Sequence, residues 1–335
     1  MLRRRPFIAA TLALAATTSL PSFAQDNWPS KPVKLISPFP AGGTSDVMAR
    51  MIAEALTKEL GQQFVVDNIG GAGGTIGTLR AAKSTPDGYT IVQTGVGQNA
   101  VAHGLDPKLQ YDSMRDFVHL AQVHSGPNVL VVHPGTPFKT FKEFVEYVRK
   151  NPGKLNYGYT HAASGHMAME LLKQRASECP KGVKECNGFF MVGIPYRGGG
   201  PMLQDLLGGQ FPLMFINQDV ALPHVKAGKL RVLAVMSPER ISTMPDVPTI
   251  AESGYPGFEA SVWHAFIAPR GTPPAVVDRL NAEVRKALAQ PDVKERFAGL
   301  GAEVAPTSPE QLGAIIRSER ERYDRLIRDA KIRVD

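Results

Sequence analysis

The sequence of 335 residues contains only two cysteines and a small excess of basic residues, 38 Lys and Arg against 31 Asp and Glu. Two cysteines exclude a small fold held by many disulfides, and 43% hydrophobic with 21% charged residues exclude wholesale disorder. So mild a positive charge, with no basic run interleaved with aromatics, argues against nucleic acid as a partner. The longest apolar stretch, Phe7 to Leu20, has about 14 residues, short of the ~20 that a membrane-spanning helix needs.

That apolar stretch lies in a segment typical of an export signal. Arg3–Arg5 precede it, and Ser22-Phe23-Ala24 follows it with small residues at the first and third positions. This order predicts a signal peptide over residues 1–24, cleaved after Ala24, and a soluble, exported mature protein. Arg4-Arg5-Pro6-Phe7-Ile8 also resembles a twin-arginine signal, so the general secretory and twin-arginine export routes both stay open.

The two cysteines, Cys179 and Cys186, lie close together in one polar segment. In an exported protein such a pair is expected to form a disulfide, which contributes ~2.5 kcal/mol in the loop-entropy model. A metal site is the weaker alternative, because the spacing does not match C-x₂₋₄-C and no histidine flanks the pair. We therefore predict a structural disulfide.

Beyond Val33, short runs of β-branched residues alternate with helical patterns, which is typical of α/β units around a mostly parallel sheet. Single hydrophobic cores stop growing near roughly 250 to 300 residues, so this chain is expected to form two domains. Ser125-Gly126-Pro127, between two apolar runs, is the predicted crossover. The predicted division is a discontinuous domain 1, residues 25–124 and 236–335, and a domain 2, residues 125–235, with a cleft between them.

The sequence contains none of the familiar catalytic or metal-binding motifs. G-x-S-x-G, H-E-x-x-H, the P-loop and the EF-hand loop are all absent. Its eight histidines include no pair at i,i+2 or i,i+4, the usual local spacing of metal ligands. The sequence therefore predicts neither an enzyme nor a metal centre.

Glycine-rich loops are the sequence's main candidate for ligand binding. The segment from Gly71 to Gly77 reads G-x-G-x-x-x-G instead of G-x-G-x-x-G, so it indicates a dinucleotide only weakly and no cofactor is predicted. Together with Pro40–Ser45 and Ala162–Gly165, it precedes a predicted helix and offers amides and hydroxyls without Lys or Arg. Such loops suit a carboxylate held by helix dipoles, worth ~0.3–1 kcal/mol each. The alternative is that these glycines only form turns.

Seven motifs, in order, resemble those of one family: Trp28–Val33, Pro38–Asp46, Gly71–Gly77, Pro86–Thr90, Pro195–Pro201, Pro245–Gly257 and Ala268–Pro273. The family is the Bug, or tripartite tricarboxylate transporter, substrate-binding proteins of bacterial periplasms, and the resemblance covers essentially the whole mature chain. It implies an α/β, two-lobed periplasmic binding protein of type II, the Venus-flytrap kind. It also implies a non-catalytic protein that delivers a carboxylate to a membrane carrier with one large and one small integral subunit.

The resemblance further implies which residues contact the ligand. Three loops contribute in the family, often through bridging waters, and two residues after a middle-domain strand would face the cleft. The implied set is Phe39, Gly42, Gly43, Ser45, Asp46, Gly73, Gly74, Thr75, Ala163, Ser164, His166, Asn217 and Asp219. Asp46 could instead cap the helix or hold a water, and Phe39 could be a packing aromatic.

The chain departs from the family pattern between Tyr157 and Ser164, where the loop is one residue shorter and carries Tyr159 and His161. Tyr159 could stack on the ring of an aromatic carboxylate or be a surface tyrosine. We predict a periplasmic receptor for a small organic mono- or dicarboxylate, aromatic acids included. The alternatives are a ligand-sensing partner of a membrane sensor kinase and, less favoured, a nucleotide-dependent enzyme.

Overall fold

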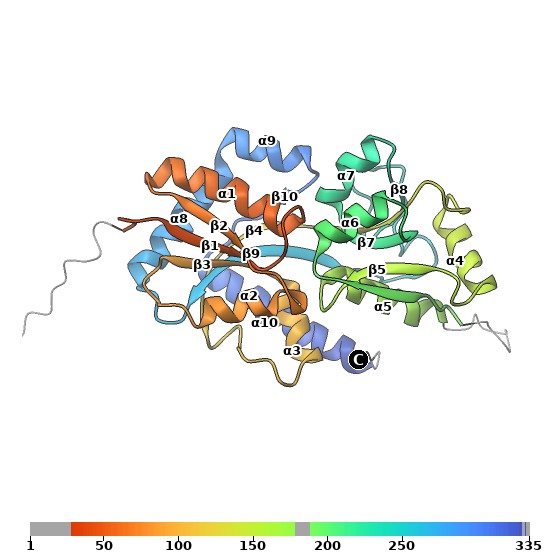
Figure 1. The fold of residues 1–335 in the computed structure, drawn as a ribbon, viewed down its shortest axis with the longest axis horizontal. Helices are drawn as coiled ribbons and strands as arrows, with labels where there is room; N and C mark the ends of the chain where they lie inside the picture. Colours follow the sequence, from red (N-terminus) through yellow and green to blue (C-terminus); the bar gives the residue numbers. More distant parts are fainter. Residues whose placement is uncertain (1–27, 178–187, 330–331, 333–335) are drawn as a thin grey trace, which may run out of the picture.

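The computed structural model describes residues 28–177, 188–329 and 332 (Figure 1). The predicted signal peptide, its cleavage site and the predicted Cys179–Cys186 disulfide lie outside the described residues. Within the described ranges, no helix combines the length and the apolar character that crossing a membrane requires.

The first lobe is a mixed sheet covered by helices on both faces. Its parallel strands run in the order β2-β1-β3, and β9 adds an antiparallel neighbour to β3. The strands are β1 (Val33–Ser37), β2 (Phe64–Asn68), β3 (Thr90–Gly95), β9 (Ser261–Pro269) and β10 (Glu303–Val304). The helices are α1 (Thr44–Leu60), η1 (Ala72–Gly74), α2 (Thr75–Ala82), η2 (Gly97–Val101), α3 (Ala102–Leu105), α8 (Pro274–Ala289), α9 (Pro291–Gly299) and α10 (Pro309–Asp329).

The second lobe repeats this plan with a smaller sheet. Strand β5 pairs in parallel with β6 and β7. The strands are β5 (Asn156–Thr160), β6 (Val192–Tyr196), β7 (Leu213–Asn217) and β8 (Arg231–Val235). The helices are α4 (Phe141–Lys150), α5 (Ser164–Ser177), α6 (Gly199–Leu207) and α7 (Gln218–Lys226).

One long strand, β4 (Phe117–Val132), belongs to both lobes. Its first part, Phe117–Pro127, pairs with β9, and its second part, Asn128–Val132, pairs with β7 and β8. The predicted crossover at residues 125–127 lies where β4 changes partners, but the two strands expected on either side of it are one strand. The chain continues there as strand, because β9 supplies antiparallel partners as far as Pro127. The result is one 10-stranded sheet that runs through both lobes. Figure 1 shows the two α/β lobes side by side.

The hydrophobic core fills both faces of the sheet in each lobe. In the first lobe, α1 and α8 pack on one face through Ile52 and Leu280, and α10 packs on the other through Ile316. In the second lobe, Phe144 and Leu206 lie in the clusters on opposite faces. The C-terminal helices α8 and α10 thus cover opposite faces of the sheet in the first lobe.

The segment between β8 and β9 packs with the second lobe. Met236, Ile250 and Phe258 join its core cluster, and the Met236 amide donates to the carbonyl of Asn128 over 3.0 Å. The division into domains stays a prediction, and we propose that its second boundary falls at the start of β9 instead of at residue 236.

We expect Thr140→Ala to lower the free energy of unfolding by about 1 kcal/mol, the usual cost of losing an N-cap. The Thr140 hydroxyl accepts from the Glu143 amide over 3.2 Å, and the Glu143 carboxylate accepts from the Lys139 amide over 2.7 Å. Urea unfolding measures the change. Lys142→Ala, at an exposed position in the same turn, is the control, and equal stabilities of the two variants would contradict this role for the cap.

Candidate functional site

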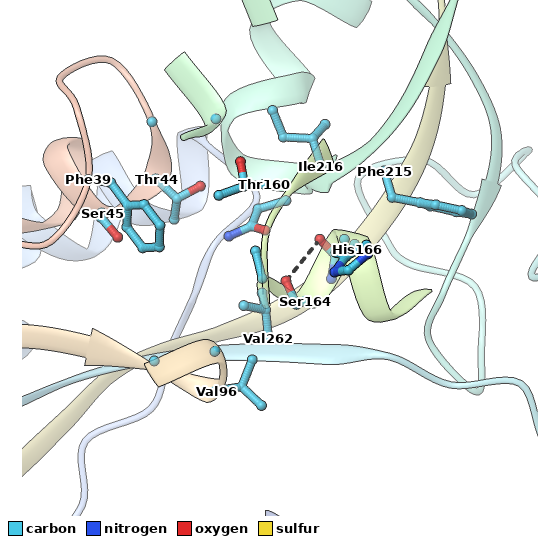
Figure 2. Close-up of a pocket in the computed structure, with 18 of the residues that line it drawn as sticks. Phe39, Thr44, Ser45, Val96, Thr160, Ser164, His166, Phe215, Ile216 and Val262 are labelled. Carbon is cyan, nitrogen blue, oxygen red and sulfur yellow. Dashed lines mark hydrogen bonds between the residues drawn. The ribbon is translucent and has the colours of Figure 1, made fainter. Parts of the chain in front are cut away.

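The main candidate site is a cavity between the two lobes. It holds about 710 Å³ of space between atoms, counting open solvent at its mouth, and about 90 Å³ of this is open to the centre of a water-sized sphere. Figure 2 shows Thr44 and Ser45 of the first lobe facing the same space as Ser164 and His166 of the second. Strands β4 and β9 contribute the wall where they pass between the lobes.

Four helices begin at this cavity. Gly43, Thr44 and Ser45 line it at the start of α1, and the first residues of α5 and α6 and the N-cap of α7 also line it. The N-cap residues of α1, α6 and α7 make no side-chain capping bond. The first-turn amides of α1 and α6 therefore remain available, whereas the amides of Asp219 and Val220 in α7 act on the Asp219 carboxylate. No Lys or Arg is among the described residues that line the cavity. The arrangement favours an anion held by amides and helix dipoles.

Side chains on the wall add further hydrogen-bonding capacity. Each of four is more than nine-tenths buried and has a polar atom without a hydrogen-bond partner among the described residues. They are Asn128 Nδ2, Thr160 Oγ1, His166 Nδ1 and His264 Nδ1. Leaving such an atom unpaired costs about 1–3 kcal/mol, so a polar ligand that pairs with these atoms gains stability.

Both cavity histidines are neutral near pH 7. Burial lowers the pKa of His166 to about 4, although the Glu170 carboxylate acts in the opposite direction. Burial, and then the neighbouring His124, lowers the pKa of His264 to about 3. A neutral imidazole can donate from one nitrogen and accept at the other. In the described parts of the chain, no group of three or more His, Cys, Asp or Glu is placed to hold a metal ion.

The predicted ligand residues divide into two groups. Seven line the cavity: Phe39, Gly43, Ser45, Ala163, Ser164, His166 and Asn217. Six do not: Gly42, Asp46, Gly73, Gly74, Thr75 and Asp219. Contact with a ligand stays a prediction for all thirteen, and the positions of the second group indicate other roles.

Asp46 holds the loop that precedes α1. Its carboxylate accepts from the Gly42 amide over 3.1 Å, from Asn68 Nδ2 over 3.0 Å and from Arg50 Nη2 over 2.9 Å. Burial raises the pKa of Asp46, but the bonds from Arg50, Gly42 and Asn68 outweigh it and leave the pKa below its usual value. Asn68 Nδ2 also donates to the Phe39 carbonyl over 3.0 Å. These bonds fix the loop's position at the cavity.

The glycine-rich loop lies at the contact between the lobes. A Cβ on Gly73 would overlap the carbonyl oxygen of His161 in the second lobe, and its φ of +65° also favours glycine. Gln98 anchors the loop, since its Nε2 donates to the Gly73 carbonyl over 2.6 Å. The Thr75 hydroxyl is occupied by a bond to the Ala72 carbonyl over 2.9 Å.

Asp219 of the second lobe forms a hydrogen bond to the first lobe. It is 1% exposed, and its Oδ1 accepts from the Thr44 hydroxyl of the first lobe over 3.1 Å. Burial raises the pKa of Asp219, opposed by His124, by the Thr44 bond and by the amides of Asp219 and Val220. Its other oxygen has no partner among the described residues.

Tyr159, expected in a loop, lies in strand β5 and behind the cavity. The Tyr159 ring stacks on His166 with centroids 4.6 Å apart and an interplanar angle of 24°. Tyr159 itself does not line the cavity, so its ring supports His166 from behind. The strand residues Asn128, Thr160 and His264 were missed in the sequence, because only the docking of the lobes turns them toward one space.

Two α/β lobes around a cavity bordered by helix N-termini define a solute-binding protein of the periplasmic type. Residues 48–332 match the family model described as the tripartite tricarboxylate transporter family receptor, and the chain belongs to this family. The chain is 39% identical to a UPF0065 protein of Pseudomonas sp. strain P51, over 97% of this chain and 94% of that one. It is 37% identical to BugT of Bordetella pertussis, over 96% and 94%.

Solved structures are similar over nearly the whole chain. The periplasmic binding protein BugD is 35% identical with a TM-score of 0.85, covering 91% of this chain and 99% of that one. A Rhodopseudomonas palustris protein solved with adipate is 33% identical with a TM-score of 0.85, covering 91% and 99%. MatC of the same organism, with bound malate, is 34% identical with a TM-score of 0.82, covering 90% and 100%. The protein is thus a solute-binding receptor and not an enzyme.

We expect Asn68→Ala to accelerate amide hydrogen exchange in residues 39–43 by up to roughly thirtyfold, because the bonds to the Phe39 carbonyl and to the Asp46 carboxylate are lost at about 1 kcal/mol each. Exchange followed by mass spectrometry measures this without any ligand. Asp67→Ala, which removes only the exposed ion pair with Lys34, is the control. Unchanged exchange in the Asn68 variant would show that the loop is held by other contacts.

Proposed function

We propose that this protein is a periplasmic receptor that captures a small organic mono- or dicarboxylate, aromatic acids included, in the cavity between its lobes. The observation that carries the proposal is the convergence of four helix N-termini on a cavity lined by no Lys or Arg. Charge-assisted bonds from amides to a carboxylate contribute about 1.5–3 kcal/mol each. A few of them are enough for micromolar binding after the cost of association.

The relatives support a carboxylate as the ligand. Two similar structures carry adipate and malate, both dicarboxylates. In this chain, Phe39, Met202 and Phe215 give the cavity an apolar section that suits a methylene chain or a ring between the polar ends. Because Tyr159 stacks on His166, an aromatic acid would contact Phe39 or Phe215 instead.

Closure of the lobes is the proposed way of capture. The lobes already touch through the Thr44–Asp219 bond and through a bond from Gln218 Nε2 to the Gly301 carbonyl. Gly43 packs against Gly200, with no side chains between the two backbones. A ligand that bonds to helix N-termini of both lobes stabilises this closed arrangement over an open one. The closed receptor would then deliver its carboxylate to a membrane carrier with a large and a small integral subunit, which the family's name supports.

A thermal-shift screen of the chain from Gln25 onward tests the proposal. The panel contains aliphatic dicarboxylates, tricarboxylates, aromatic carboxylates, amino acids and neutral amides, after unfolding and refolding to remove carried-over ligand. A carboxylate at 100 times its Kd should add ~2.7 kcal/mol and raise the midpoint by several degrees. Stabilisation by neutral amides alone, or by no panel member, would contradict the proposal.

We expect Gly200→Ala to weaken carboxylate binding by about tenfold or more without destabilising the fold. Gly200 is helical in α6, where alanine favours the helix by about 0.5–1 kcal/mol, but its Cβ would overlap the Ala41 carbonyl of the opposite lobe. Calorimetric titration and thermal unfolding measure the two effects. Gly208→Ala, at the other end of α6 with only ordinary contacts, is the control. Unchanged affinity of the Gly200 variant would contradict closure at this contact.

A further inference from the structure

Two buried histidines stack directly behind the cavity. His124 of β4 and His264 of β9 are register partners, with ring centroids 5.5 Å apart and an interplanar angle of 19°. His264 lines the cavity, whereas His124 is 1% exposed. Neither ring nitrogen of His124, nor Nδ1 of His264, has a hydrogen-bond partner among the described residues. The strands that carry the pair are the two that connect the lobes.

An acidic residue of the second lobe, Asp219, lies near His124 across the contact between the lobes. His124 acts electrostatically on the buried Asp219, whose Oδ2 has no partner among the described residues. The other oxygen of Asp219 accepts from Thr44, which itself lines the cavity. The series His264, His124, Asp219 and Thr44 thus begins at the cavity, crosses behind it and returns to it.

Among the described residues, His124 is the titratable group that acts electrostatically on both His264 and Asp219. Asp219 comes from α7, and His166 of α5 lines the same cavity as His264. Phe297 of α9 packs edge-on against His124 with centroids 6.4 Å apart, and Val304 of β10 is its register partner; both are uncharged. On the cavity side, Gln98 is neutral. A positive charge on the stacked rings would therefore be balanced by the Asp219 carboxylate and by an anion in the cavity.

We propose that capture of a carboxylate is coupled to the uptake of one proton from solvent by His264, the member of the stacked pair that lines the cavity. This inference rests on the proposed function, because the bound carboxylate supplies the negative charge that stabilises the imidazolium. The proton adds to a ring nitrogen, and no other bond forms or breaks.

The sign of the pH dependence follows from linkage. In the structure without ligand, burial and His124 keep the pKa of His264 low, at about 3. A carboxylate beside His264 raises that pKa, so the complex binds more protons than the free receptor. Affinity should then increase as pH falls from about 7.5 to about 5.5, and this gain is lost as pH rises through the pKa in the complex. Near and below about pH 5 the ligand's own carboxyls begin to protonate.

Calorimetric titration in buffers of different ionisation enthalpy tests the coupling. The first probes are adipate and malate, followed by the panel acid that stabilises the protein most. At pH 6.0 we expect the wild type to take up about 0.5–1 proton per ligand, and affinity to rise about threefold to tenfold between pH 7.5 and 5.5. His264→Gln should remove most of the uptake. His166→Gln should weaken binding but keep the uptake, which separates the two cavity histidines.

Histidine NMR of the wild type keeps the test independent of any variant's stability. The Cε1–Hε1 signal of His264, assigned by its absence in His264→Gln, should move toward the imidazolium position when the ligand is added at pH 6.0. Binding without proton uptake, or equal uptake in wild type and His264→Gln, would overturn the coupling and leave the receptor function intact. Failure of the wild type to bind any carboxylate of the panel would overturn both.

Discussion

The antiparallel pairing of β4 with β9 is the constraint on which the rest of this receptor depends. Both strands pass between the lobes. Their pairing from Phe117 to Pro127 joins the strands of the two lobes into one continuous sheet. This sheet brings the start of α1 in the first lobe opposite the starts of α5, α6 and α7 in the second. The cavity exists because these strands hold the helix N-termini at one place.

A site built from dipoles and neutral side chains has consequences for a protein that must also release its ligand. In the proposed mode of binding, a carboxylate is held without a Lys or Arg side chain, so no permanent buried cation is left unpaired when the ligand departs. Glycines at the contact between the lobes, such as Gly43 and Gly200, let the backbones meet closely. The same residues that shape the anion site therefore also permit the lobes to separate and close.

Much of the fold could be predicted because it depends on local patterns. The alternation of apolar runs indicated the α/β class, and two of the three glycine-rich loops marked helix starts that border the cavity, those of α1 and α5. Asp46 illustrates the limit: its place in a binding-loop motif was clear, but its bonds to Gly42, Asn68 and Arg50 depend on how β2 lies beside α1. Asn128, Thr160 and His264 carried no sequence signal, because strand residues face the cavity only once both lobes are in place.

The most direct test of the central claim is a crystal structure of the complex with a bound carboxylate. We expect the carboxylate oxygens within about 2.7–3.2 Å of first-turn amides from α1 and from at least one of α5, α6 and α7. A carboxylate paired with a Lys or Arg side chain, or bound outside the cavity between the lobes, would contradict the account.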